Sequence, residues 1–237
     1  MAIILNGSTG IVEANIADNA ITTNKIASGA VAAGDLASAL DLSSKSLTLP
    51  AGVGGAWIRL AGGDISGEIG SIAYSGFTND YDHYVFVAEN FGSANTGTSV
   101  PCRVRLKDSG GTTLTASNYR WTSSHAYVTQ AQGGLHNVHA AWNDSFFGIY
   151  GTNDTKGGTP DQNGLNGHVH FYRPTDSSKR TYVTFHTVAV EQGDDQFNSH
   201  CGGGYYSVAG SHSGFEFFFS TDNIRTGSYA IYGVKNT

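Results

Sequence analysis

Branched aliphatic residues recur at every fifth position near the start of the chain. The positions are Ile11, Ile16, Ile21, Ile26, Val31 and Leu36, with mostly small or polar residues between them. Steps of five residues advance by roughly 140° around an α-helix, so these side chains would scatter around its axis. On a β-strand, an odd step places successive aliphatic residues on opposite faces. The pattern therefore predicts neither an amphipathic helix nor a half-buried strand.

One aliphatic residue in five is too few to build a core within a single chain. A regular repeat that cannot bury its apolar positions alone requires partners, and the simplest partners are identical copies around a shared axis. We therefore predict an intertwined homotrimeric shaft whose axis is lined by these aliphatic residues. The predicted organisation is a docking segment at 1–15, the shaft at 16–45, a linker at 46–56 and a head at 57–237.

The pattern after residue 57 is an alternation of apolar and polar positions. In residues 100–107 the even-numbered positions are apolar and three odd-numbered ones are basic, which predicts a half-buried strand. Residues 83–88 are apolar on both faces, which predicts a central strand. Further strands are expected at 69–74, 118–127, 145–150, 167–173, 180–190, 204–208, 215–220 and 228–234. Because glycine-rich turns separate these segments, we predict an all-β fold, an antiparallel jelly-roll-like β-sandwich.

Composition supports a folded head and argues against several partners. The 237 residues include 32 glycines and 4 prolines, and 11% of the residues are aromatic, which is typical of a folded chain. The net charge of −6, without a basic run, argues against nucleic acid as a partner. We expect no signal peptide and no membrane insertion, because residues 1–7 lack a basic start and no apolar run is long enough to span a bilayer. For Cys102 and Cys201 we therefore expect two buried thiols, with a disulfide as the alternative.

The pentad segment at 16–31 resembles the shaft repeats of bacteriophage tail fibres, particularly those of marine phages. Residues 5–10 are similar to a common lead-in of such fibres, and residues 222–235 to the closing strands of many fibre heads. The resemblance implies a homotrimeric virion protein, made in the host cytoplasm, that docks on other virion proteins through its N-terminus. It further implies that the head binds a host cell-surface receptor, for which we expect a carbohydrate. It carries over no catalytic residues and no cofactor.

Two other functions stay open. The chain is short for a complete tail fibre, so a capsid-bound head fibre or a decoration protein is the alternative. A polysaccharide-degrading tailspike is less favoured, because such enzymes usually need a long β-helix and a pair of carboxylates, and the sequence indicates neither.

Aromatic residues close to Asn and Asp are the candidates for receptor binding. A ring can stack on the apolar side of a sugar while amides and carboxylates take its hydroxyl groups, and long polar loops are common recognition sites. The alternative is that these rings pack in the core or in the trimer interface. The candidates are Trp121, Tyr127, Trp142, Asn143, Asp144, Asn153, Asp154, Tyr205 and Tyr206.

A histidine pair, His168 and His170, is the candidate for a metal site. Two residues apart on a strand, the imidazoles lie on one face and about 7 Å apart along it. Close to a threefold axis, three such pairs would supply six nitrogen ligands for a transition metal. The alternative is a pair of solvent-facing or interface histidines without a metal.

Overall fold

The computed structural model describes residues 57–94, 100–128, 135–150, 164–190 and 197–235, and at positions 135 and 136 only the backbone. These residues belong to one compact unit, Pro50–Thr237. The predicted docking segment and shaft lie outside them, as do Asn153 and Asp154, so the predictions for those residues stay predictions.

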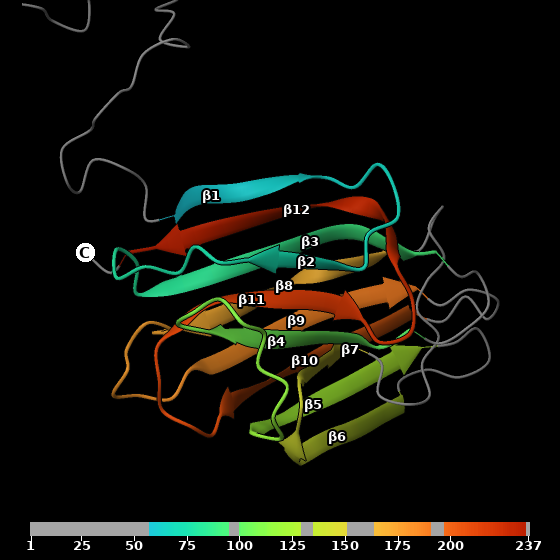
Figure 1. Ribbon diagram of the computed structural model, residues 1–237. Helices are drawn as coiled ribbons and strands as arrows, with labels where there is room; N and C mark the ends of the chain where they lie inside the picture. The colour runs from blue at the N-terminus through green and yellow to red at the C-terminus, as the bar shows by residue number, and fades with distance from the viewer. Residues whose placement is uncertain (1–56, 95–99, 129–134, 151–163, 191–196, 236–237) are drawn as a thin grey trace, which may run out of the picture. The chain divides into compact units, whose positions relative to one another are not determined.

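Two antiparallel sheets make up the described part of the head (Figure 1). The larger sheet has eight strands in the order β1-β12-β3-β8-β9-β10-β5-β6, and the smaller has four in the order β2-β11-β4-β7. The strands are β1 (Trp57–Asp64), β2 (Ser71–Tyr74), β3 (His83–Ser93), β4 (Cys102–Asp108), β5 (Tyr119–Val128), β6 (Leu135–Asp144), β7 (Phe147–Tyr150), β8 (Leu165–Tyr172), β9 (Tyr182–Val190), β10 (Phe197–Tyr206), β11 (His212–Phe219) and β12 (Ile224–Val234). No helix occurs in the described residues, and therefore none that is long and apolar enough to cross a membrane.

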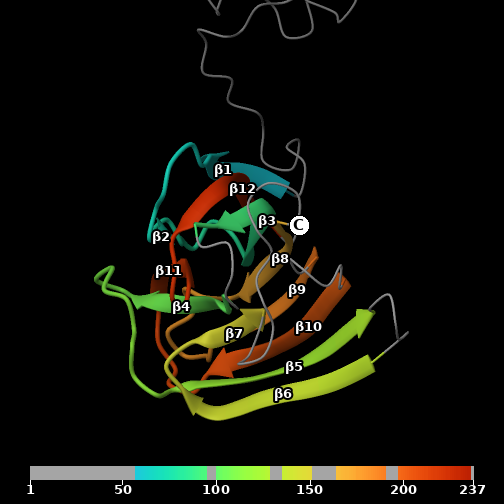
Figure 2. The same ribbon diagram turned by 90° about the vertical axis from the view of Figure 1, so that its right-hand side faces the viewer.

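The strand order is that of a jelly roll with two added hairpins. Without β5, β6, β9 and β10, the sheets read β1-β12-β3-β8 and β2-β11-β4-β7. The chain then crosses from sheet to sheet at almost every connection, as in a double Greek key. The added strands extend only the larger sheet, and Figure 2 shows β5 and β6 at its far edge.

Aromatic rings fill the space between the sheets. The ring of Phe215 in β11 lies 4.8 Å from that of Phe171 in β8 and 5.2 Å from that of Phe86 in β3, measured between centroids. All three side chains are buried. Burying such a side chain stabilises the fold by about 1.5–3 kcal/mol, and favourable ring contacts add about 0.5–1.5 kcal/mol. One face of the larger sheet therefore packs against the core. We call its opposite face, which is directed away from the smaller sheet, the outer face.

The structure confirms the all-β prediction, and several strands follow the predicted alternation. Cys102, Val104 and Leu106 are buried in β4 while the basic residues between them are partly exposed. β3 lies between β12 and β8, which agrees with the central position predicted from its two apolar faces.

Two stretches for which no strand was predicted belong to strands. Residues 135–144 form β6, and β10 begins at Phe197 rather than at residue 204. Three successive glycines interrupt the apolar and polar alternation of β10, so the sequence did not predict the full strand. Their neighbours in the structure leave no room for side chains. A Cβ atom at Gly202 would lie 2.2 Å from the carbonyl oxygen of Thr122, and one at Gly204 would lie 2.3 Å from that of Arg120. Close backbone packing therefore selects glycine here.

The cysteine prediction is half wrong. Both thiols are free, but only Cys102 is buried, and burial raises its pKa well above the ordinary value. Cys201 is exposed in β10, where it faces outward because its neighbour His200 occupies the inner face.

Candidate functional site

Strand register brings cationic and aromatic side chains together on the outer face. Tyr205 in β10 lies directly opposite Arg120 in β5 on one side and Tyr182 in β9 on the other. Their sequence neighbours Tyr206 and Val183 are buried in the core. Since successive residues of a strand alternate between faces, this burial fixes the three side chains on the outer face.

The rings and guanidinium groups are interleaved. The guanidinium carbon of Arg120 lies 4.2 Å from the ring centroid of Trp142 in β6 and 5.7 Å from that of Tyr205. Arg120 Nη1 also donates a hydrogen bond of 3.1 Å to the Tyr205 hydroxyl. On the other side, the guanidinium carbon of Arg180 lies 5.3 Å from the Tyr205 centroid, and Tyr182 lies 5.7 Å from Tyr205 between centroids. We call these five residues the aromatic platform.

The platform is open and has a floor of small residues. Trp142 is 67% exposed and Tyr182 is 53% exposed. A hollow of about 500 Å³ lies over Arg120, Trp142 and Tyr205, with Ala140, Thr122, Gly203 and Gly204 among its lining residues. The small side chains on the neighbouring strands leave the hollow open beside the Trp142 and Tyr205 rings. Exposed rings beside hydrogen-bonding groups suit a sugar, which has both apolar faces and polar edges.

A second hollow, of about 260 Å³, adjoins the platform at the ends of β8 and β9. Tyr182 and Arg180 line it, together with Tyr172, Arg173, Lys179, Asp82 and His83. Burial lowers the pKa of His83, and Asp82 partly offsets this effect. Tyr182 and Arg180 line this hollow and contact Tyr205, which lines the first one, so the two hollows are neighbours on the surface.

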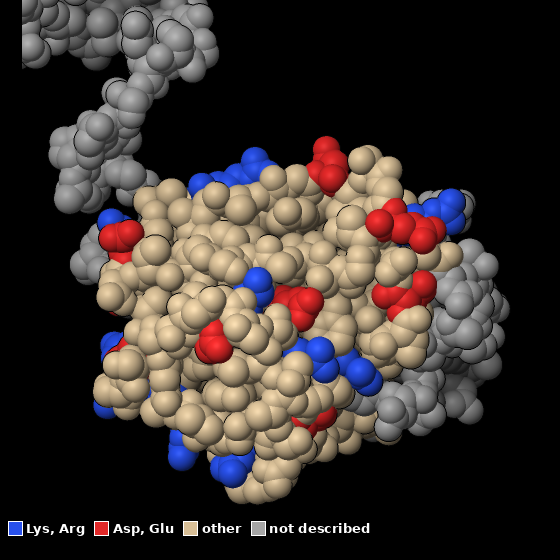
Figure 3. Space-filling model, viewed as in Figure 1, with Lys and Arg blue, Asp and Glu red and all other residues tan. Residues whose placement is uncertain are grey.

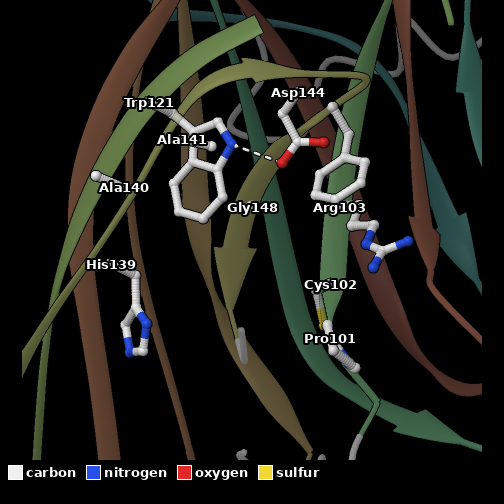
Figure 4. A pocket seen from close by; sticks show the side chains of 10 residues that line it. Pro101, Cys102, Arg103, Trp121, His139, Ala140, Ala141, Asp144 and Gly148 are labelled. Atoms are coloured by element: carbon white, nitrogen blue, oxygen red, sulfur yellow. Dashed lines mark hydrogen bonds between the residues drawn. The ribbon is translucent and has the colours of Figure 1, made fainter. Parts of the chain in front are cut away.

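A third hollow, of about 280 Å³, lies on the opposite side of β5 and β6, between the two sheets (Figure 4). Trp121 Nε1 donates a hydrogen bond of 3.3 Å to Asp144 Oδ2, and Arg103 lies 4.0 Å over the ring of Phe146. Burial lowers the pKa of Arg103, and Asp144 partly offsets the shift. Trp121 is only 7% exposed and packs so closely on Gly148 that a Cβ atom there would lie 2.7 Å from the indole. The indole face is therefore closed to a stacking ligand.

Two of the predicted receptor-binding residues lie together in the platform, whereas two others are buried in the core. Trp142 and Tyr205 meet at Arg120 in the platform. Trp121 and Tyr206 are buried, so their prediction as sugar platforms is corrected: adjacent strand residues take opposite faces.

The other candidates within the described residues do not join the platform. Tyr127 is half-buried, with its ring 5.1 Å from that of His125, and Asp144 lies in the inter-sheet hollow. Asn143 is exposed at the end of β6, beside Trp142.

The histidine pair lies on the outer face, within a separate group of rings. The centroids of His168 and His170 are 5.0 Å apart. Burial, followed by the effect of neighbouring His168 and His83, lowers the pKa of His170 to about 4. The described residues hold no group of three or more side chains suited to a metal ion. A site shared between chains stays a prediction. We call the group Trp57, His83, His168, His170, Tyr172 and Tyr232 the ring cluster.

Sequence reasoning missed Arg120, Arg180 and Tyr182. The available signal was the spacing of Arg180 and Tyr182, since residues two apart on a predicted strand share a face. The pairing of Arg120 with Tyr205 had no such signal, because it depends on the register of β5 and β10.

Comparisons with protein-family models, with curated proteins and with solved structures gave no match.

Proposed function

We propose that this protein is a homotrimeric virion fibre whose N-terminal segment docks on the phage particle and whose head attaches to a host-surface glycan. The observation that carries the attachment role is the aromatic platform, in which exposed Trp142 and Tyr182 flank Arg120 and Tyr205 on a rigid sheet. Strands hold these groups in fixed positions, so little conformational entropy is lost on binding. Three heads on one shaft would also multiply weak contacts by raising the effective concentration.

The attachment role is tested with full-length protein on host cells and host-derived polysaccharide. We expect Trp142→Ala and Tyr205→Ala each to weaken binding about tenfold, since each removes a ring that stacks on the ligand. Val208→Ala is the matched control, because Val208 is also an exposed apolar residue but lies outside the platform. Equal binding by all three variants would reject the platform as the attachment site.

The shaft and docking roles have their own tests. Replacing Ile21 and Ile26 with Asp should dissociate the homotrimer, because buried aliphatic residues stabilise it by about 1.5–3 kcal/mol each. An unchanged trimer by native mass spectrometry would contradict the shaft prediction. Deleting residues 1–15 should prevent incorporation into particles, and intact incorporation would contradict the docking role.

The alternative functions predict different results in two experiments. Electron microscopy of particles with a labelled head distinguishes a tail fibre from a capsid-bound head fibre or decoration protein. Chain length of the host polysaccharide after incubation with the protein tests the tailspike alternative, which requires shortening; an attachment protein leaves the length unchanged.

A further inference from the structure

We infer that the glycan bound by the aromatic platform is anionic, and that its acidic groups pair with a row of arginine and lysine side chains along one end of the eight-stranded sheet. This inference rests on the proposed attachment function and names the chemical class of the ligand. The acidic groups would be carboxylates, sulfates or phosphates carried on the sugar chain.

The distribution of charge is the first argument. The chain is acidic as a whole, with 13 Lys and Arg against 19 Asp and Glu and a net charge of −6. Nevertheless, four cations gather around the two hollows: Arg120, Arg173, Lys179 and Arg180. The hollow over Arg120 has no carboxylate among its described lining residues. The adjoining hollow has Asp82, and Asp176 interacts electrostatically with Lys179 and Arg173, so the four cations outnumber two carboxylates. The local field at this end of the sheet therefore favours an anion.

The alternation of rings and cations is the second argument. Across neighbouring strands the order is Trp142, Arg120, Tyr205, then Arg180 with Tyr182, and finally Tyr172. From β6 to β8 this row crosses four strand spacings, or about 19 Å at about 4.8 Å each. A surface of this length suits an extended chain of several sugars rather than one sugar. Rings would stack on sugar faces while the guanidinium groups between them pair with acidic substituents.

The state of Arg120 is the third argument. Its guanidinium group is held against Trp142 and by its hydrogen bond to Tyr205, so its orientation is fixed before the ligand arrives. Its Nε atom is buried and has no hydrogen-bond partner. The covered Nε does not reach a ligand, so pairing with a carboxylate or sulfate would use the terminal N–H groups of this fixed, planar guanidinium.

The test compares chemically matched polymers on the full-length protein. Alginate is set against alginate whose carboxylates have been reduced to alcohols, and dextran sulfate against dextran, all by biolayer interferometry at 150 mM salt. We expect the acidic member of at least one pair to bind at least tenfold more tightly than its neutral counterpart. Binding should weaken as salt rises, because the cations are exposed.

Charge-removing variants test the specific residues. Arg180→Gln and Arg120→Gln should each lower affinity for the acidic polymer by about fivefold or more, and both should flatten the salt dependence. Arg225→Gln is the matched control, since Arg225 is exposed in β12 and lines neither hollow. Because Arg180 is exposed and packs on the surface only, its variant keeps the test valid if Arg120→Gln fails to fold.

The outcomes separate this inference from the proposed function. Equal binding of the acidic and neutral polymers, with both platform variants unaffected, would overturn the inference and leave glycan attachment in place. An equal loss in Arg225→Gln would also overturn it, because it would show general attraction to polyanions. Preferential binding to anionic lipid vesicles would replace the glycan by a membrane surface. If the protein binds neither these polymers nor any host-derived polysaccharide, the proposed function itself fails.

Discussion

The two faces of the eight-stranded sheet carry similar side chains but differ in what covers them. The inner face presents rings such as Phe171 and the stacked pair His125 and His200, whose centroids are 4.1 Å apart, and the smaller sheet covers much of it. The outer face presents the ring cluster and the platform, and no described strand covers it. Aromatic residues and histidines therefore do not mark the core by themselves. Coverage by the second sheet does.

The outer face holds most of the exposed apolar side chains. Nine large hydrophobic residues are exposed in the described part of the chain, and only Ile58 and Val208 lie elsewhere. The other seven are Trp57, Val128, Val138, Trp142, Tyr172, Tyr182 and Phe197. The outer surface of the smaller sheet differs, because Arg103, Arg105 and Glu216 are interspersed there, and Figure 3 shows both signs of charge on that side. A face so rich in apolar groups indicates an interaction surface.

The largest expected difference between the two faces concerns adjacent residues of β8. Phe171→Ala should lower the free energy of unfolding by about 3–5 kcal/mol, because it leaves a cavity among packed rings. Tyr172→Ala should cost less than about 1 kcal/mol, since its side chain is on the outer face and exposed. Urea unfolding of the two variants measures both values. Similar losses would show that the outer rings contribute to the core as much as the inner ones do.

On the inner face, His200 should make one of the largest contributions to destabilisation of the head by acid. Burial, then the neighbouring His125 and His139, lowers the pKa of His200 to about 3. The unfolded chain takes up this proton near pH 6.5 and the folded chain only near pH 3, so protonation favours unfolding in between. Stability is complete above about pH 6.5 and falls by about 3 kcal/mol towards pH 4, at about 1.4 kcal/mol per pKa unit.

Urea unfolding between pH 7 and pH 4 measures this loss, and His200→Gln should reduce it. His186→Gln serves as the control, since His186 is exposed on the outer face. An equal change in the two variants would contradict the assignment to the inner face.

In the proposed homotrimer we expect the ring cluster to face the neighbouring copies. Trp57 belongs to this cluster and is the residue at which β1 begins, directly after the predicted linker, so in a trimer joined through the predicted shaft we expect it to be close to its copies. Around a symmetry axis identical residues of the chains meet, so an uncharged face is favourable and an added cation is repelled by its own copies in the other chains. Ala230→Arg, on the outer face of β12, should therefore weaken head-to-head contact by about tenfold.

The readout is acrylamide quenching of Trp57 fluorescence in a Trp142→Phe background, because the third tryptophan, Trp121, is buried. Trp57 should be shielded in the parent protein although it is 51% exposed in a single chain, and Ala230→Arg should expose it. Ala73→Arg, on the exposed face of β2, is the matched control and should leave quenching unchanged. Full quenching in the parent would show that the ring cluster is free.

The smallest expected effect concerns the two cysteines. Cys201 should react with a maleimide in the folded protein, whereas Cys102 should react only after unfolding, since it is buried and its pKa is raised. Cys201→Ser should abolish this reaction while changing the free energy of unfolding by less than about 0.5 kcal/mol. Mass spectrometry counts the modified thiols. Two modified thiols in native protein would contradict the burial of Cys102.

How much the sequence could predict depended on whether a strand has one apolar and one polar face. β4 does, and its residues were assigned to the correct faces. β6 does not: Val138 and Trp142 face outward while His139 lies at the inter-sheet hollow, so apolar and polar residues occur on both sides. In such a strand, apolar and polar residues do not alternate, so the pattern that predicts a half-buried strand is missing.

The sequence indicated that aromatic residues would form the candidate site, but it did not indicate which of them would meet there. Tyr205 and Tyr206 are equivalent in sequence, and only the position of the second sheet decides that Tyr205 is available and Tyr206 is buried. The same holds for Trp121, whose neighbour Arg120 takes the outer face. Face assignment requires knowing which side is covered, and that information lies in residues far along the chain.

The place of β12 has a consequence for the timing of assembly. β12 lies between β1 and β3, so the first strand of the head gains its described partner only through the last one. During synthesis the ribosome makes β12 after the eleven other strands, and until then β3 presents an unpaired edge beside β1. The pentad repeat, by contrast, emerges before any strand of the head. In the proposed homotrimer, neighbouring nascent chains would thus align through their repeats while their heads are still unfinished, and the register of the three chains would be set before any head closes.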